Sequence, residues 1–175
     1  MIERLGILAS DFAVLSLLSV GGASAVLPEM HRSLVEVHGW MTTREFADLY
    51  ALAQASPGPN VLVVSLYGWQ SAGVAGAVVT TLAMILPSSV LTFYADRMLW
   101  RSSGALAWRE IIDNALAPIT VGLIAASGAI LASANASNPV AMLIIAATAL
   151  LSWRTKIHPL WLIAAGAVAG VAGLV

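Results

Sequence analysis

The sequence predicts an all-α fold: a polytopic helical membrane protein with about five or six membrane segments, some of them broken or re-entrant. Three observations support this prediction. The composition is 59% hydrophobic and only 10% charged, and the mean hydropathy is +0.89. The apolar residues gather into long runs, and too few polar residues remain to cover a soluble globule. Prolines and glycines interrupt several of these runs, which indicates helices broken beside protein or a water-filled cavity.

Six apolar runs define the candidate segments. Crossing the roughly 30 Å hydrocarbon layer takes about 20 helical residues, so the first run and the last two are short for complete spans. The runs are Leu5–Val20, Phe46–Trp69, Ser71–Ala95, Ile111–Ser133, Pro139–Trp153 and His158–Val175. The first run lacks a basic leader region, so we expect a retained span and not a signal peptide. If the segment after Gly22 or the segment around Pro57 is instead a re-entrant hairpin, five passes result.

The basic residues predict the orientation of these segments. Seven of them lie in alternate connections, and Arg4 alone lies on the opposite side; the seven are Arg32, Arg44, Arg97, Arg101, Arg109, Arg154 and Lys156. By the positive-inside rule these connections are cytoplasmic, so the N-terminus is predicted outside. No soluble domain or long linker interrupts the pattern, and residues 1–175 are expected to form one membrane domain.

The strongest local feature is the helix-breaking run Ser56-Pro57-Gly58-Pro59-Asn60. Each proline removes a backbone donor, and unpaired backbone groups are costly in hydrocarbon. Pro59 suits the first turn of a second half-helix, whose free N–H groups and dipole can hold an oxyanion. Gln54 adds an amide donor. We therefore expect residues 54 and 56–60 to line a substrate site.

Two further breaks are candidates for the same site. Gly21-Gly22 ends the first apolar run, and Pro87-Ser88 interrupts the third. The simpler alternatives are a turn at the glycines and a helix kink at the proline, with serines meeting the freed carbonyls. Convergence of three polar breaks predicts a substrate pathway with hinges at Gly21-Gly22 and Pro87.

Together these motifs resemble the chromate transporter family. The resemblance rests on the order and spacing of segments up to about Ala125: Gly21-Gly22, Leu27–Arg32, His38–Thr42, Glu45–Asp48, Ala53–Asn60, Tyr67–Trp69, Leu86–Ser88 and Ala117–Leu123. It implies a short, single-domain member that moves chromate, with sulfate as a related anion, across a bacterial inner membrane. It also implies a homodimer or a pair with a homologous chain of opposite orientation. Two departures from the pattern are Val20-Gly21-Gly22-Ala23, where many members have Phe-Gly-Gly-Pro, and His31-Arg32, where a basic pair is common.

Charged residues near the breaks suggest how an anion is bound and coupled. A guanidinium suits a tetrahedral dianion, and Arg32 is the best candidate, although it also suits an interfacial anchor. Asp11 lies inside an apolar run, where a carboxylate is a candidate proton carrier unless it sits at the outer interface. Glu29 can pair with Arg32 or exchange a proton, and His31 is a candidate because histidine side chains change charge near physiological pH. Asp11, Glu29 and His31 are thus the candidates for proton coupling.

The predicted function is secondary transport of chromate, with sulfate as the related anion, by alternating access at the broken helix. The alternative is a membrane subunit that needs a partner chain for any transport. An enzyme is not expected, because the sequence has no cysteine, no His-Glu-x-x-His helix and no nucleophile elbow. We find no cofactor motif, no metal-ligand spacing and no nucleic-acid signature, so the expected partners are the anion, the bilayer and a second chain.

Overall fold

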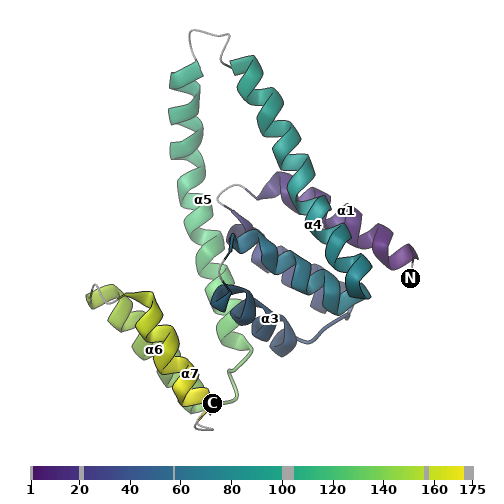
Figure 1. Cartoon of the computed structure of the whole chain (residues 1–175). Coiled ribbons are helices and arrows are strands. Elements are labelled where there is room, and N and C mark those ends of the chain that lie inside the picture. The colour runs from purple at the N-terminus through teal and green to yellow at the C-terminus, as the bar shows by residue number, and fades with distance from the viewer. Residues whose placement is uncertain (1, 20–21, 57, 100–104, 156–157, 172–175) are drawn as a thin grey trace. The chain divides into compact units, whose positions relative to one another are not determined.

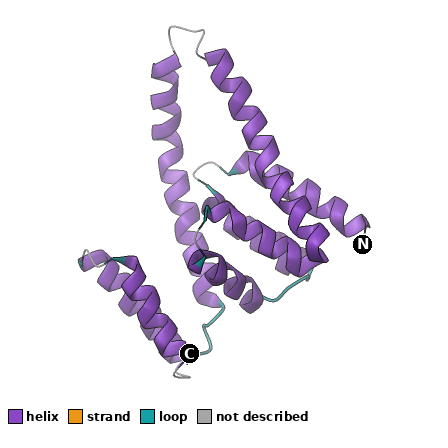
Figure 2. Cartoon of the chain, in the orientation of Figure 1, coloured by secondary structure: helices purple, strands orange, loops and turns teal. Residues whose placement is uncertain are grey.

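The computed structural model describes the chain except for residues 1, 20–21, 57, 100–104, 156–157 and 172–175. Every regular element among the described residues is helical and none is a strand, which confirms the all-α prediction (Figure 2). The elements are α1 (Ile2–Leu18), η1 (Ala23–Val26), α2 (Leu27–His31), η2 (Arg32–Val37), α3 (Thr43–Ala55), η3 (Asn60–Leu62), α4 (Val63–Leu99), α5 (Ala105–Ser133), α6 (Pro139–Arg154) and α7 (Pro159–Val171). The chain forms two compact units, Met1–Gly128 and Ala129–Val175.

The first unit begins with a helical hairpin. α1 and the helical run Ala23–Val37 are bent by 120° across the break that contains Gly22. Gly22 has φ +99°, which a glycine adopts without strain. Asp11 on α1 meets Ser33 on the returning arm, although 22 residues separate them. Contact across such a separation requires the chain to turn back, so the two helical stretches are the arms of a hairpin.

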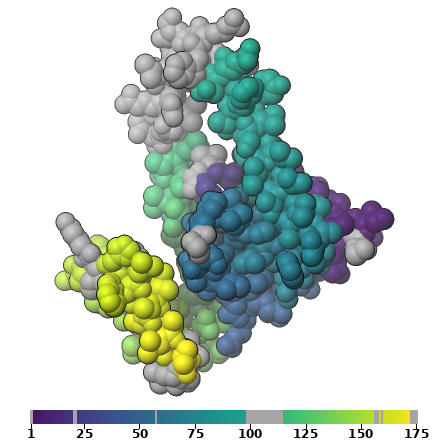
Figure 3. Space-filling model, viewed as in Figure 1, coloured from purple at the N-terminus to yellow at the C-terminus, as the bar shows by residue number. Residues whose placement is uncertain are grey.

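A second hairpin surrounds the Pro-Gly-Pro break. The rings of Phe46 on α3 and Tyr67 on α4 stack with centroids 4.4 Å apart, and the Tyr67 hydroxyl donates to the Phe46 carbonyl at 3.3 Å. If α3 continued as one interrupted helix, 21 residues would place these rings about 30 Å apart. The arms are therefore antiparallel, and they lie in contact in the packed blue surface of Figure 3. The chain therefore turns back at the Pro-Gly-Pro break and does not continue as one interrupted helix.

The chain reverses again inside α4. Ala72 (φ −149°, ψ 24°) and Gly73 (φ 66°, ψ −155°) are not helical, and they divide α4 into two arms. The Thr80 hydroxyl donates to the Val64 carbonyl at 2.8 Å, and Gly68 lies against Gly76. Residues 60–71 extend only about 18 Å at 1.5 Å per residue. That arm is too short to cross a membrane alone.

The long arm of α4 packs along α1, as Figure 1 shows. Leu8, Phe12 and Leu15 of α1 are buried. The backbone N–H of Ser88, directly after Pro87, donates to the buried hydroxyl of Ser16 at 3.1 Å. Because a proline disturbs the hydrogen bonding of its helix, the α1 hydroxyl compensates locally.

Two helical stretches are long and apolar enough to cross a membrane, Asn60–Arg97 and Ala115–Ser133. A third results if the bent pair of α1 and Ala23–Val37 counts as one span, and two shorter apolar helices lie in α6 and α7. Even without the arm before Gly73, the remainder of α4 is about 36 Å long up to Arg97. The chain is thus a multi-pass helical membrane protein.

The second unit consists of the end of α5 followed by α6 and α7. Asn138 caps α6, and its side-chain oxygen accepts from the N–H groups of Val140 and Ala141. Most of the described large side chains of this unit are exposed and apolar, including Trp153 and Trp161. This is the surface that a lipid-facing helix requires.

Candidate functional site

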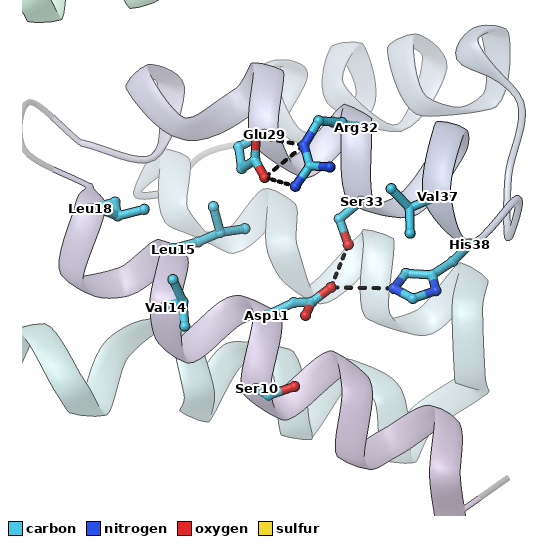
Figure 4. A pocket seen from close by; sticks show the side chains of 10 residues that line it. All are labelled: Ser10, Asp11, Val14, Leu15, Leu18, Glu29, Arg32, Ser33, Val37 and His38. Atoms are coloured by element: carbon cyan, nitrogen blue, oxygen red, sulfur yellow. Dashed lines mark hydrogen bonds and ion pairs between the residues drawn. The ribbon is translucent and has the colours of Figure 1, made fainter.

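A cavity lies between the arms of the first hairpin. It has a volume of about 360 Å³, within the range of ligand sites. We call it the α1–η2 pocket; its lining residues are Ser10, Asp11, Val14, Leu15, Leu18, Glu29, Arg32, Ser33, Val37 and His38. Figure 4 shows the polar side chains of both arms turned toward one another. This pocket contains both carboxylates and the guanidinium that the sequence analysis selected.

Asp11 is the centre of one side-chain cluster in this pocket. The Ser33 hydroxyl donates to Asp11 Oδ2 at 2.5 Å, and His38 Nε2 lies 3.5 Å from the same oxygen. The side chains of Asp11 and His38 are 32% and 23% exposed, so both are half-buried. His38 also stacks on Trp40 with ring centroids 4.5 Å apart. The carboxylate and the imidazole are therefore held in place from both arms.

Arg32 and Glu29 form the second cluster, three residues apart on one helix face. Arg32 Nε donates to both carboxylate oxygens of Glu29, at 2.9 and 3.0 Å, and Nη2 donates as well. These side chains are 56% and 45% exposed, more open than the Asp11 cluster. The structure thus places the anion candidate Arg32 in an ion pair at the open side of the pocket.

A π-helical turn, η2, positions this wall of the pocket. Its hydrogen bonds close at i→i+5, as in the bond from the His38 N–H to the Ser33 carbonyl at 3.0 Å. π-turns inside helices often mark functional sites. The longer turn places Ser33 and His38 on the Asp11 side of the arm. Sequence analysis missed both residues, since no local pattern distinguished this turn from an α-helix.

His31 lies outside the α1–η2 pocket. Its ring is buried, with Nε2 3.1 Å from the Thr43 hydroxyl and an edge-to-face contact with Phe46. Nδ1 lies 3.2 Å from a Glu36 carboxylate oxygen but lacks hydrogen-bond alignment. The π-turn brings Glu36 beside His31, because residues five positions apart lie close together in a π-helix. Of the predicted proton carriers, the structure gathers Asp11 and Glu29 but not His31.

A smaller cavity of about 190 Å³ lies at the tip of the second hairpin. We call it the hairpin-tip pocket; its lining residues are Ala53, Ser56, Gly58, Pro59, Leu62, Ser65 and Leu66. None of these side chains is charged. Polar groups here come from serines and from backbone at the break. The predicted broken-segment site therefore corresponds to an uncharged pocket without Arg32.

The remaining predicted residues are distributed around these two pockets. Pro57 and Gly21 lie outside the described residues. Gln54 bonds to the Tyr50 hydroxyl at 2.7 Å, and Asn60 is exposed at the start of the returning arm. Neither these two nor Gly22, Pro87 and Ser88 line either pocket.

The helix start at the break differs from the expectation in one respect. Pro59 is the N-cap, with an extended backbone, and not a first-turn residue. Its carbonyl accepts from the Leu62 N–H at 2.9 Å, and no side chain caps this end. Neither Ser56 nor Asn60 therefore caps this helix start with its side chain. Without a side-chain cap, the first N–H groups of this arm stay available to water or a ligand.

Comparisons with known proteins identify the family of this chain. The family described as "Chromate transporter" matches residues 7–171. A "Probable chromate transport protein" of Synechococcus elongatus is 32% identical over 69% of this chain and 30% of its own length. "Chromate transport protein" relatives of Cupriavidus metallidurans and Pseudomonas aeruginosa are 30% and 31% identical, over 73% and 88% of this chain and 32% and 38% of their own lengths.

The chain thus spans about a third of the length of these curated relatives. No solved structure matches it significantly. The family match covers nearly the whole sequence, including both hairpins and both pockets. By this match, the chain belongs to the chromate transporter family.

Proposed function

We propose that this chain transports tetrahedral oxyanions, chromate and the related sulfate, across a bacterial inner membrane. The observation that carries the proposal is the pocket at the tip of the second hairpin, found in a member of the chromate transporter family. Irregular backbone at membrane depth is tolerated where it is buried or lines a water-filled cavity, and transporters use such breaks as binding sites.

The mechanism we propose is alternating access around the tip of the second hairpin. At the tip, Gly58 and Asn60 present their backbone N–H groups to the anion, and Arg32 supplies a positive charge along the pathway. Gly22 lies in the turn of the first hairpin, and Pro87 lies within the long arm of α4, which stays helical there. These two positions act as hinges, and the N-terminus faces the outside, as the basic residues indicate.

A second candidate function is a subunit that completes the pathway of a partner chain. This function is favoured by the length of the relatives from Synechococcus elongatus and Cupriavidus metallidurans. Each is about three times as long as the region that matches this chain. The assembly we propose is a homodimer or a pair with a homologous chain inserted in the opposite orientation. In this case the isolated chain folds but moves no anion.

Flux measurements in proteoliposomes test these functions. The purified chain is reconstituted alone, and uptake of radiolabelled sulfate and of chromate is followed with and without a pH gradient. Saturable uptake above empty vesicles supports a self-sufficient transporter. Correctly folded protein without uptake contradicts it and supports the partner-dependent subunit. Chloride uptake by the same vesicles is the control for leakage.

A further inference from the structure

The net charge of the α1–η2 pocket is unfavourable for binding an oxyanion. With His38 neutral, Asp11 and Glu29 contribute two negative charges and Arg32 one positive charge. The pocket then carries a net charge of −1, which repels a dianion. Arg32 is also paired with Glu29 and is not a free cation. An oxyanion can enter this pocket favourably only if a positive charge is added.

We propose that the α1–η2 pocket binds an oxyanion and one proton together, with the proton held by His38 against Asp11. This inference rests on the proposed function, since it names the coupling of that transport. Proton and anion then cross in the same direction, as a symport. It assigns the coupling role to the pair Asp11–His38, in place of the predicted His31.

The geometry prepares this pair for the proton. His38 Nε2 lies within ion-pair distance of Asp11 Oδ2, and the Ser33 hydroxyl already fixes that oxygen. Stacking on Trp40 holds the imidazole plane. Protonation converts the repulsive carboxylate into half of a neutral ion pair. Histidine is suited to this step, because its charge changes between pH 5 and 8.

Other charged groups lie near Asp11 and His38. Glu36 of η2 acts electrostatically on Arg32, but its carboxylate lies 3.2 Å from His31 Nδ1 and does not line the pocket. Glu29 and Arg32, on α2 and η2, line the same pocket. Arg4 of α1 lies over Trp40, but its guanidinium donates to the Ser71 carbonyl at 3.1 Å. On the other side of α1, α4 has no charged residue between Val63 and Ala95. The net charge of the pocket lining is therefore set by Asp11, Glu29, Arg32 and His38.

Thermodynamic linkage gives this proposal a definite sign. If the anion favours proton binding, the proton favours anion binding by the same free energy. For one linked proton, sulfate affinity should fall by up to about tenfold per pH unit above the titration of the imidazole. Competition between proton and anion would give the opposite slope and an antiport.

Calorimetric titration of sulfate into the purified chain tests the linkage without requiring transport. Titrations in buffers of different ionisation enthalpy count the protons taken up per anion between pH 6 and 8. We expect uptake of close to one proton and tighter binding at pH 6. No proton uptake, proton release, or no sulfate binding at either pH overturns the proposal.

Two variants have opposite expected effects. Asp11→Asn removes the repelling carboxylate, so sulfate should bind at pH 8 as tightly as it binds the unmodified chain at pH 6. His38→Gln keeps the Asp11 carboxylate but removes the imidazole that holds the proton. Sulfate binding should therefore stay weak at both pH 6 and pH 8. His38→Gln should lose the pH dependence, and Asp11→Asn should shift it to lower pH, because His38 then lacks the carboxylate that stabilises its proton. The matched control is His158→Gln, an exposed histidine of the second unit. Unchanged pH dependence in folded Asp11→Asn contradicts the proposal even if His38→Gln does not fold.

Proteoliposome flux separates this inference from the proposed function. A pH-sensitive dye inside the vesicles should report acidification as sulfate enters. Sulfate uptake without acidification overturns the symport and leaves oxyanion transport standing. Proton-linked sulfate binding without any flux contradicts autonomous transport and leaves the pocket assignment standing.

Discussion

The α1–η2 pocket and the hairpin-tip pocket both lie at a reversal of the chain, yet they differ in chemistry. The first contains four ionisable side chains between two helical arms, and the second contains serines and backbone around a proline break. The sequence grouped Arg32 with the broken segment, and the structure separates them. The charged side chains of the α1–η2 pocket and the polar backbone of the hairpin-tip pocket are therefore separate features, and each can be altered by mutation without changing the other.

The largest effect is expected at the packing that supports the hairpin tip. A Cβ on Gly68 would lie 2.3 Å from Thr80 Oγ1 and 2.4 Å from the Gly76 carbonyl oxygen. Gly68→Ala should therefore open the two arms of α4, at a cost of about 3 kcal/mol. Size-exclusion chromatography of detergent extracts should show little monodisperse protein. Gly128→Ala, which meets nothing within 4 Å, is the control, and equal yields would refute the tight contact.

At the hairpin tip itself, Pro57→Ala and Asn60→Ala should abolish oxyanion flux while membrane insertion stays normal. The reason is that Asn60 begins the returning arm, whose first N–H groups have no side-chain cap, and that Pro57 precedes this arm in the sequence. Flux in proteoliposomes and protein yield are measured together. Gln70→Ala removes an exposed amide at the other end of the same arm and should transport normally. Normal flux in both tip variants would remove the site from residues 56–60.

In the charged pocket, Arg32→Gln should weaken oxyanion affinity by about tenfold or more, because hydrogen bonds to a charged group contribute about 1.5–3 kcal/mol. The half-saturating sulfate concentration measures this change, and protein level should not follow it. Arg44→Gln, an exposed arginine outside both pockets, is the matched control. An unchanged affinity would make Arg32 an interfacial anchor.

A smaller effect is expected at the contact between α1, which lines the α1–η2 pocket, and α4, which lines the hairpin-tip pocket. Ser16→Ala leaves the Ser88 N–H without its partner on α1, which should cost about 1–2 kcal/mol. Thermal unfolding in detergent measures the loss. Ser133→Ala, whose hydroxyl bonds only within its own helix turn in the described structure, should be close to neutral. If both variants unfold alike, the Ser16 bond does not stabilise α4 next to Pro87.

The smallest effect concerns the start of α3, outside both pockets. Hydrogen bonds from the backbone and the hydroxyl of Thr42 lower the pKa of the Glu45 carboxyl. A lowered folded-state pKa stabilises the fold above the ordinary glutamate range, and this stabilisation is lost as pH falls through the folded-state pKa. Glu45→Gln should remove a small part of the stability at pH 7 and none at low pH. Melting temperatures of the variant and the unmodified chain at both pH values test this, and a constant difference would contradict it.

Local sequence properties were sufficient for much of the fold. Apolar run length predicted the helical membrane class, and the Pro-Gly-Pro run predicted the interruption near residue 57. Gly21-Gly22 marked a second break. A proline or a run of apolar side chains acts on its own few residues, so these features can be recognised without knowledge of distant contacts.

The site was predicted only in part. Asp11, Glu29 and Arg32 were chosen as ionisable groups near apolar runs, and the structure brings them to one pocket. Ser33 and His38 were missed, since their contact with Asp11 depends on the turn at the first hairpin and on the π-helical register of η2. His31 was chosen for its chemistry but is buried against Thr43 and Phe46.

The sequence by itself thus determined the membrane class, the helices and the positions of the breaks. The tertiary structure alone decided where the chain goes after each break, and so which side chains meet. Phe46 with Tyr67 and Val64 with Thr80 close the hairpins through contacts 16 to 21 residues apart. Such contacts depend on the packing of whole helices, and no single residue specifies them, because the same break is compatible with either a continued or a returning chain.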